Sequence, residues 1–309
     1  MSERLPRAFG PFQLEVKLGQ GGMAEVFRAR VFGASGFEKR VVVKTLREEL
    51  VGTPELERMF LEEARLQALL FHRNLVQAHE FGVVDGRPWV RLDWVDGVEL
   101  GALALPLAAP LVRFIGAEVA LGLHALHQAT DEQGRPLGVV HRDVSPTNVL
   151  VSKLGEVKLS DFGIARATQL REQTRAGVRK GTHAYMSPEQ VSGRALSVAS
   201  DQFSLAVLLV ELLTGARPFE GGTPLETMDL IREAAPPALP GREPALEAVL
   251  LRALSKDPAQ RFGTSEAFRA AVQASGPVAD ELELARVVAG AKPGAAATVQ
   301  TRIDSAISE

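Results

Sequence analysis

The spacing of hydrophobic and polar positions changes about a third of the way along the chain. Up to about residue 95, apolar residues mostly alternate with polar ones or form short runs, a pattern typical of β-strands. Strands are predicted over 12–18 and 39–46, and Asp85-Gly86 within 83–90 is a strong signal for a two-residue hairpin turn. The pattern predicts five strands in this region, with a single helix over 54–71.

Helical spacing dominates the rest of the chain. The segment 198–214 is apolar almost all round, as a buried central helix should be. Further helices are predicted over 110–128, 224–234, 243–254 and 265–274. From residue 275 small and polar residues prevail, so a flexible tail is predicted over 275–309, in which 281–288 has the spacing of a short helix. The fold class is therefore α+β.

Composition narrows the class of protein further. The chain has 309 residues, of which 46% are hydrophobic and 24% charged, which fits one large globular domain or two lobes. A net charge of −3 gives no reason to expect nucleic acid or an acidic membrane as partner. There is no cysteine, so disulfides and a thiolate nucleophile are excluded. The first ten residues lack a signal-peptide core, and the apolar stretch 203–213 is too short to span a bilayer, so we expect a cytoplasmic location.

Two carboxylates and an amide lie among valines and leucines in the middle of the chain. The runs 149–151 and 157–159 predict two short strands joined by a turn at Leu154-Gly155. Asp143 and Asn148 lie on the loop entering the first strand, and Asp161 follows the second. A hairpin would bring these oxygens together in a site suited to Mg²⁺ carrying phosphates. Solvated turn aspartates are the alternative, but His-Arg-Asp-x4-Asn followed by Asp-Phe-Gly is much rarer by chance.

A lysine and a glutamate in the first third are a second candidate pair. Lys44 follows three valines at the end of a predicted strand. On the helix predicted over 54–71, a 3.6-residue period places Glu63 in the middle of the apolar stripe that contains Met59 and Phe60. A carboxylate on an inward face needs a cation as partner, and Lys44 is the candidate. Gln67 lies on the same stripe, so Glu63 is not its only polar residue.

The central motifs resemble those of a known family. His141 to Asn148 is similar to the catalytic loop of protein kinases, and Asp161-Phe162-Gly163 to their magnesium-binding motif. The closest likeness is to eukaryotic-type serine/threonine kinases, including their bacterial branch. It implies a bilobal protein kinase fold, with a small β-rich lobe over 10–95, a larger α-rich lobe over 96–274 and a tail over 275–309. By this resemblance Asp143 is the catalytic base, while Asn148 and Asp161 hold Mg²⁺ on the phosphates of ATP.

The resemblance also implies a nucleotide site. Gly19 to Val26 is similar to the family's glycine-rich loop, with Ala24 in place of the third glycine, and such loops let backbone N–H groups approach phosphates closely. Lys44 and Glu63 would orient the α- and β-phosphates. The backbones of Asp93 and Val95 would bond the adenine edge. The residues expected to contact ATP are Leu18, Gly19, Gln20, Gly21, Gly22, Met23, Ala24, Glu25, Val26, Lys44, Asp93, Val95 and Leu150.

The segment after Asp161 is similar to the family's activation segment and substrate platform. Basic residues between 167 and 180 are interleaved with Thr168 and Thr174, which resembles a loop whose phosphothreonine is held by cations such as Arg142. A solvated loop is the plainer alternative. The run 181–189 resembles the part of the family that docks a polypeptide, so we expect protein substrates with Ser or Thr and disfavour a small-molecule kinase. Self-association for autophosphorylation in trans is also expected.

One position departs from the family pattern. Serine/threonine kinases usually carry Lys two residues after the catalytic Asp, where this chain has Ser145, and no other basic residue lies between Asp143 and Lys153. Losing one donor to a developing charge costs about 10²–10³-fold in rate. The alternative function is therefore a pseudokinase, an ATP-binding scaffold with weak transfer. Against that alternative, Lys44, Asp143 and Asp161 are all present.

Overall fold

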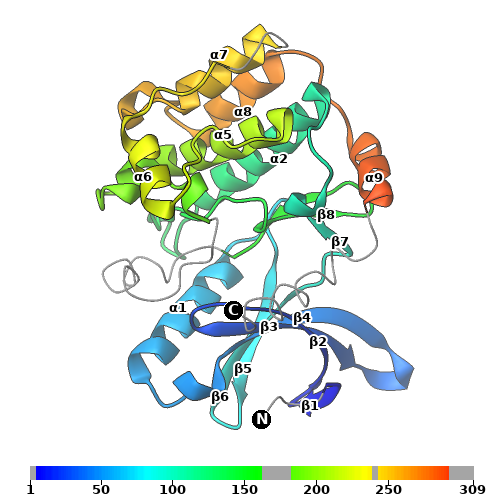
Figure 1. The fold of residues 1–309 in the computed structure, drawn as a ribbon. Coiled ribbons are helices and arrows are strands. Elements are labelled where there is room, and N and C mark those ends of the chain that lie inside the picture. Colours follow the sequence, from blue (N-terminus) through cyan, green and yellow to red (C-terminus); the bar gives the residue numbers. More distant parts are fainter. Residues whose placement is uncertain (1–4, 162–181, 239–242, 292–309) are drawn as a thin grey trace. The chain divides into compact units, whose positions relative to one another are not determined.

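The computed structural model describes residues 5–161, 182–238 and 243–291, and they form two compact units (Figure 1). Residues 5–71 and 76–96 belong to the first unit, and 72–75 and the described residues from 97 to 291 belong to the second. Phe162, Gly163, the segment 167–180 and residues 292–309 lie outside the described residues.

The first unit is built on one antiparallel sheet of six strands in the order β1-β2-β3-β4-β6-β5. Its strands are β1 (Arg7–Phe9), β2 (Phe12–Gln20), β3 (Ala24–Phe32), β4 (Glu38–Leu46), β5 (Ala78–Val84) and β6 (Arg87–Asp93). The prediction of five strands missed β1, whose three residues are too few to show a period. The hairpin turn at Asp85-Gly86 is confirmed, since both residues have the positive φ that a primed turn requires.

One α-helix, α1 (Pro54–Leu69), packs against β5 and β6. Its buried face contains Met59, Phe60 and Ala64, the spacing that the sequence predicted. The sheet packs its own core around Phe12 and Trp89, whose rings meet edge to face at 4.7 Å.

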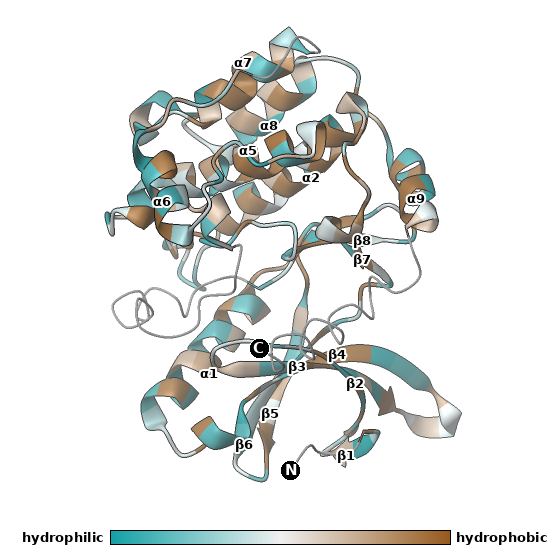
Figure 2. Ribbon diagram, viewed as in Figure 1, coloured by the Kyte–Doolittle hydropathy of each residue, from teal (hydrophilic) through white to brown (hydrophobic). Residues whose placement is uncertain are grey.

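The second unit is mainly helical. Its α-helices in the described ranges are α2 (Ala109–His127), α4 (Pro188–Val191), α5 (Val198–Thr214), α6 (Pro224–Glu233), α7 (Pro244–Ala253), α8 (Ser265–Ala274) and α9 (Glu281–Gly290). Helix α5 packs against α2, α7 and α8 and is buried along most of its length. Figure 2 shows α5 and α2 as predominantly hydrophobic ribbons. By length and composition α2 could cross a membrane, but most of it is buried inside the structure, as in a core helix.

A small sheet of three strands completes the second unit. It has the order β7-β8-β9 and consists of β7 (Gly97–Glu99), β8 (Val149–Ser152) and β9 (Val157–Leu159). The predicted turn is confirmed, because Gly155 has a φ of 86° between β8 and β9. Strand β7 was not predicted. The remaining short elements are 3₁₀ turns at Ala34–Gly36, Glu48–Leu50, Leu100–Ala102, Thr182–Tyr185 and Pro258–Gln260.

The segment His72–Leu75 lies in the first lobe by sequence but belongs to the second unit. Asn74 explains why: its carbonyl accepts from the Leu159 N–H at 2.8 Å, and its side-chain amide donates to the Val157 carbonyl at 2.9 Å. The same amide donates to Glu118 of α2 at 2.8 Å. The short segment His72–Leu75 is thereby anchored to β9 and α2 through Asn74.

The predicted tail also differs from expectation. Residues 275–291 are described, and they include α9, which begins at an Asp280 capping box and buries Leu284 and Val288. The helical spacing over 281–288 is confirmed, but the surrounding segment is ordered structure rather than a flexible tail. Sequence alone missed this because small residues such as Ala and Gly do not reveal which surface a helix covers.

Candidate active site

The loop from His141 to Asn148 is held in place by a buried aspartate of α5. Asp201 is fully buried, and its two oxygens accept the backbone N–H groups of His141 and Arg142, each at 2.8 Å. His127 of α2 lies 2.7 Å from the same carboxylate. A buried carboxylate needs such partners, so Asp201 ties the loop to two core helices. The resemblance to protein kinases implies this role for an aspartate at position 201.

His141 links the loop to Ser160, which directly follows strand β9. Its Nδ1 accepts from the Asp143 N–H at 3.3 Å, and its Nε2 lies 3.2 Å from the Ser160 carbonyl. Complete burial lowers the pKa of His141, so its neutral form is favoured. The hydrogen bonds then assign the proton to Nε2, which donates to Ser160.

Asp143 and Asn148 meet directly. The Asn148 side-chain nitrogen donates to the Asp143 carboxylate at 2.9 Å and to the Asp143 carbonyl at 2.8 Å. With its nitrogen occupied in this way, the Asn148 amide has its oxygen left to act as a ligand. The Ser160 N–H donates to the Asn148 carbonyl at 2.9 Å, which places Asp161 next in the chain at the same end of the hairpin.

Two residues of this region have left-handed backbone conformations. Arg142 has a φ of 69° and Asp161 a φ of 52°, and neither is glycine. Strain of this kind persists where surrounding contacts impose it, and it concentrates at functional sites. Gln190 supplies one such contact, since its side-chain amide donates to the Arg142 carbonyl at 2.8 Å. No sequence signal pointed to Gln190.

Ser145 does not take over the role of a lysine. It is buried, and its hydroxyl lies 3.0 Å from the hydroxyl of Thr147. A short neutral side chain in this arrangement cannot bring a positive charge to a phosphate.

The predicted pair in the first unit is present. Lys44 of β4 and Glu63 of α1 are 9% and 6% exposed, and the Lys44 Nζ lies 2.7 Å from the Glu63 Oε1. The side-chain amide of Gln67 also reaches Glu63, at 3.4 Å. Lys44 and Glu63 therefore form a nearly dry ion pair, and the phosphate-orienting role of both remains a prediction.

The glycine-rich stretch forms the turn between β2 and β3. Gly19 and Gln20 pair with Val26 and Glu25, and the Gly21 N–H donates to the Ala24 carbonyl at 2.7 Å. Leu18 and Gly19 are on β2, Ala24 to Val26 are on β3, and Gly21, Gly22 and Met23 form the connection. Met23 and Ala24 are buried, so these two offer backbone rather than side chain to a ligand.

Side chains that the sequence did not single out support this turn. Arg47 donates to the Gly22 carbonyl at 3.1 Å, and its backbone N–H donates to the Met23 carbonyl at 2.9 Å. Glu25 bonds Lys17 at 2.6 Å and also pairs with Arg87. These pairings join side chains from three different strands, so no local pattern in the sequence could predict them.

The remaining predicted nucleotide contacts are placed as follows. Asp93 ends β6, where its N–H donates to the Gln77 carbonyl at 3.0 Å, and its side chain lies 2.6 Å from His79. Val95 follows β6, and Leu150 is on β8, paired with Glu99 and Lys158. Asp93 and Val95 thus belong to the first unit and Leu150 to the second.

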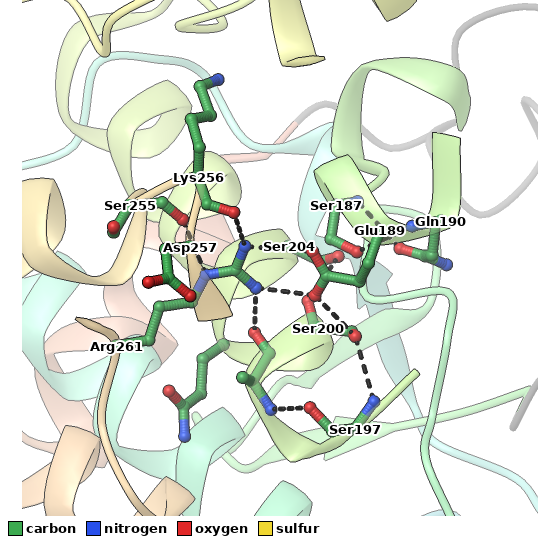
Figure 3. Close-up of polar contacts among 12 residues, drawn as sticks. Ser187, Glu189, Gln190, Ser197, Ser200, Ser204, Ser255, Lys256, Asp257 and Arg261 are labelled. Atoms are coloured by element: carbon green, nitrogen blue, oxygen red, sulfur yellow. Dashed lines mark hydrogen bonds and ion pairs between the residues drawn. The ribbon is translucent and has the colours of Figure 1, made fainter. Parts of the chain in front are cut away.

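A second buried ion pair holds helix α4 in the second unit. Arg261 binds Glu189 through two parallel contacts, Nη1 to Oε1 at 2.7 Å and Nη2 to Oε2 at 3.0 Å (Figure 3). Ser200 donates to Glu189 at 2.7 Å. The two ionic residues are 2% and 4% exposed, and this is the pairing that the resemblance to protein kinases implies for them. Thr182 begins a 3₁₀ turn.

Comparison with known proteins agrees with this arrangement. Residues 12–272 match the protein kinase domain family, so the chain belongs to that family. A relative named tyrosine-protein kinase MasK, from Myxococcus xanthus, is 40% identical over 87% of this chain and 43% of its own length. Serine/threonine-protein kinase Pkn1 of Myxococcus xanthus is 37% identical over 85% of this chain and 38% of its own.

More distant relatives add the fold. Serine/threonine-protein kinase PknE of Mycobacterium tuberculosis is 34% identical over 88% of this chain and 47% of its own length. The crystal structure of the Mycobacterium tuberculosis PknI kinase domain is similar with a TM-score of 0.61 and 27% identity, covering 89% of this chain and all of that one (100%). The chain is thus a bacterial-type kinase with the two-lobed α+β kinase fold, and it spans between 38% and 47% of the length of these curated relatives.

Proposed function

We propose that this chain is an ATP- and Mg²⁺-dependent serine/threonine protein kinase that transfers the γ-phosphate to protein hydroxyls. The observation that supports this most directly is the loop 141–148, in which Asp201 holds the backbone and Asn148 orients Asp143. A side chain that receives a proton must be fixed in position, and these bonds fix it. The match to the protein kinase domain family supports the same activity.

Each residue contributes through position and charge. Asn148 and Asp161 offer an amide and a carboxylate oxygen, which are ligands that Mg²⁺ prefers, and the ion would neutralise charge on the phosphates. Lys44, oriented by Glu63, would hold the α- and β-phosphates. Asp143 would accept the proton of the attacking hydroxyl, a contribution of about 10²–10⁴-fold in rate.

The choice of hydroxyl rests on the relatives and on the platform. Pkn1 and PknE are named serine/threonine kinases, and the run 181–189 resembles the platform of that class. Transfer to tyrosine is the second candidate, favoured by two observations: the relative named MasK is a tyrosine-protein kinase, and Ser145 supplies no cation beside Asp143.

Autophosphorylation is part of the proposal. The Arg142 Nε is buried and has no hydrogen-bond partner in the described structure. A buried guanidinium donor needs an acceptor, and a phosphorylated Thr168 or Thr174 would provide one. We expect the Thr168→Ala, Thr174→Ala double variant to lose turnover, and unchanged turnover would count against this assignment.

The first experiment is incubation with labelled ATP and Mg²⁺, followed by mapping of the phosphate by mass spectrometry. We expect phosphoserine or phosphothreonine with the wild-type chain and none with Asp143→Asn, which keeps the size of the side chain but removes the base. Phosphotyrosine on a mixed peptide substrate would establish the second candidate. ATP binding without any transfer would favour the scaffold alternative.

Ser145→Lys separates weak transfer from none. The variant restores the cation usual in serine/threonine kinases, and we expect transfer to serine peptides to rise by about tenfold or more. A chain that stays inactive after this change is not limited by the missing lysine.

A further inference from the structure

The segment after α8 is tied to the second unit although it lies beyond the matched kinase region, which ends at residue 272. Arg113 of α2 is fully buried, and its guanidinium donates to the Ser275 hydroxyl at 3.0 Å and to the Pro277 carbonyl at 3.2 Å. The Ala279 N–H then donates to the Pro110 carbonyl at 3.1 Å. A Cβ on Gly276 would lie 2.7 Å from Arg113, so this turn closely surrounds the guanidinium.

Helix α9 packs against β8, next to the turn that joins it to β9. Leu284 and Val288, one helical turn apart, form its buried face. At the start of α9 the approach is backbone to backbone, because a Cβ on Gly155 would lie 1.9 Å from the Glu281 carbonyl oxygen. Gly155 also has the positive φ of 86° that the turn requires. Glycine is therefore needed there both for the turn and for α9.

Arg73 forms a second connection to the same helix. Its guanidinium bonds Glu118 of α2 at 2.7 Å and lies 3.7 Å from the Glu281 carboxylate. The neighbouring residue, Asn74, holds β9 through Leu159 and Val157, as described above. Helix α9 thus reaches the β8–β9 hairpin directly at Gly155 and indirectly through the 72–75 segment.

The hairpin carries the candidate magnesium ligands at its other end. Asn148 precedes β8 and Asp161 follows β9 by two residues, and the Ser160 N–H closes the pair by bonding the Asn148 carbonyl. With strands of four and three residues, the paired backbone is short, so the position of the turn sets the position of both ligands. Groups that orient metal ligands without binding the metal themselves typically change metal affinity by about 10–100-fold.

We propose that α9 is a positioning element for Asn148 and Asp161. By packing on the β8–β9 hairpin it fixes the spacing of the two oxygen ligands, and this inference rests on the Mg²⁺–ATP function proposed above. The domain needed for full activity then extends to about residue 290, past the end of the matched family region.

The test uses two pairs of alanine substitutions on α9 in the full chain. Leu284→Ala with Val288→Ala removes the buried face, while Leu282→Ala with Arg286→Ala removes side chains at the same spacing on the exposed face, where Leu282 is 59% exposed. Binding of a fluorescent ATP analogue is measured against Mg²⁺ concentration, and hydrogen exchange is measured at the Leu159 and Ser160 amides.

We expect the buried-face variant to need about tenfold more Mg²⁺ for half-saturation, with faster exchange at Leu159 and Ser160. The exposed-face variant should match the wild type. A chain ending at Ala279, which keeps the bonds of Arg113, should behave like the buried-face variant.

Two results would overturn the inference. One is a lower melting temperature with unchanged Mg²⁺ dependence, which would make α9 a stabilising element only. The other is unchanged exchange at Leu159 and Ser160 in the chain that ends at Ala279. If the wild-type chain binds no Mg²⁺–ATP, the proposed function fails instead, and the exchange rates still decide whether α9 holds the hairpin.

Discussion

Both units contain a buried ion pair, but the two pairs are built differently. In the first unit the flexible ammonium of Lys44 lies 2.7 Å from the Glu63 carboxylate. Arg261 and Glu189 in the second unit share two parallel contacts, and the same guanidinium donates to the carbonyls of Ala199, Ser255 and Lys256. The arginine pair has every donor direction filled and a fixed geometry.

The difference indicates what each pair is for. A lysine ammonium is a compact charge on a flexible stem, so Lys44 can turn toward an incoming phosphate. An arginine with five bonds to one place cannot move without a large loss, which suits a scaffold. Burial alone therefore does not separate a functional pair from a structural one, whereas the type of cation and the geometry of its bonds do.

Breaking the scaffold pair should have the largest effect. Arg261→Met leaves Glu189 buried without its cation, and we expect the free energy of unfolding to fall by about 3–5 kcal/mol. Denaturant unfolding of wild type and variant gives the difference. Glu189→Gln is the matched control, since it leaves Arg261 without its anion and should lose a similar amount. A loss of unfolding free energy below about 1 kcal/mol, as for an exposed ion pair, would remove the contrast between the two pairs.

Breaking the other pair should cost activity rather than stability. Lys44→Met removes one charged donor from the proposed phosphate site, and we expect phosphoryl transfer to fall by about 10²–10³-fold. The melting temperature should drop less than in Arg261→Met, because that change removes a two-contact fork and three further bonds to backbone carbonyls. Steady-state kinetics with a serine peptide, alongside a thermal melt, checks both statements. A variant that melts as early as Arg261→Met would mean that Lys44 is mainly structural.

Charge-conserving exchanges sharpen the comparison. Arg261→Lys keeps the charge but loses the fork geometry, and we expect about 1–2 kcal/mol of destabilisation. Lys44→Arg keeps the charge at the other site and should leave stability near wild type while still lowering transfer, because a bulky planar group replaces a point charge. Unfolding and kinetic measurements on both variants check these expectations. A loss of stability in Lys44→Arg with none in Arg261→Lys would contradict the assignment.

The smallest effect is on acid stability. Burial acts to raise the pKa of Glu189, but the hydrogen bonds and charge of Arg261 and the Ser200 hydroxyl outweigh it, so the pKa is lowered. A lowered carboxyl pKa gives stability that is present above the unfolded value, about 4.3, and is lost as pH falls through the folded value. The stability difference between wild type and Glu189→Gln should therefore shrink as pH is lowered below about 4. Unfolding curves of both proteins, recorded from neutral pH down to about pH 3, measure this stability difference.

The sequence was sufficient for features that depend on short-range spacing. Glu63 was placed inward because a helical period puts it among Met59 and Phe60, and Gly155 was placed in a turn because two apolar runs flank it. The contacts of Arg47 with Gly22 and of Gln190 with Arg142 could not be foreseen, since they join residues that only the folded chain brings together. The packing of α9 could not be predicted for the same reason, because its partner Gly155 lies far back along the chain.

The anchoring of His72–Leu75 has a practical consequence for dividing this protein. A cut in the linker near residue 96 would not yield the first lobe intact, because His72–Leu75 belongs to the other unit and Asn74 bonds β9 and α2 there. A fragment ending there would expose the side chain of Asn74 and leave the Leu159 N–H of the complementary fragment without its acceptor. The two units are each compact, but their residue ranges are interleaved along the sequence. They should therefore be kept together in expression, circular permutation or domain exchange.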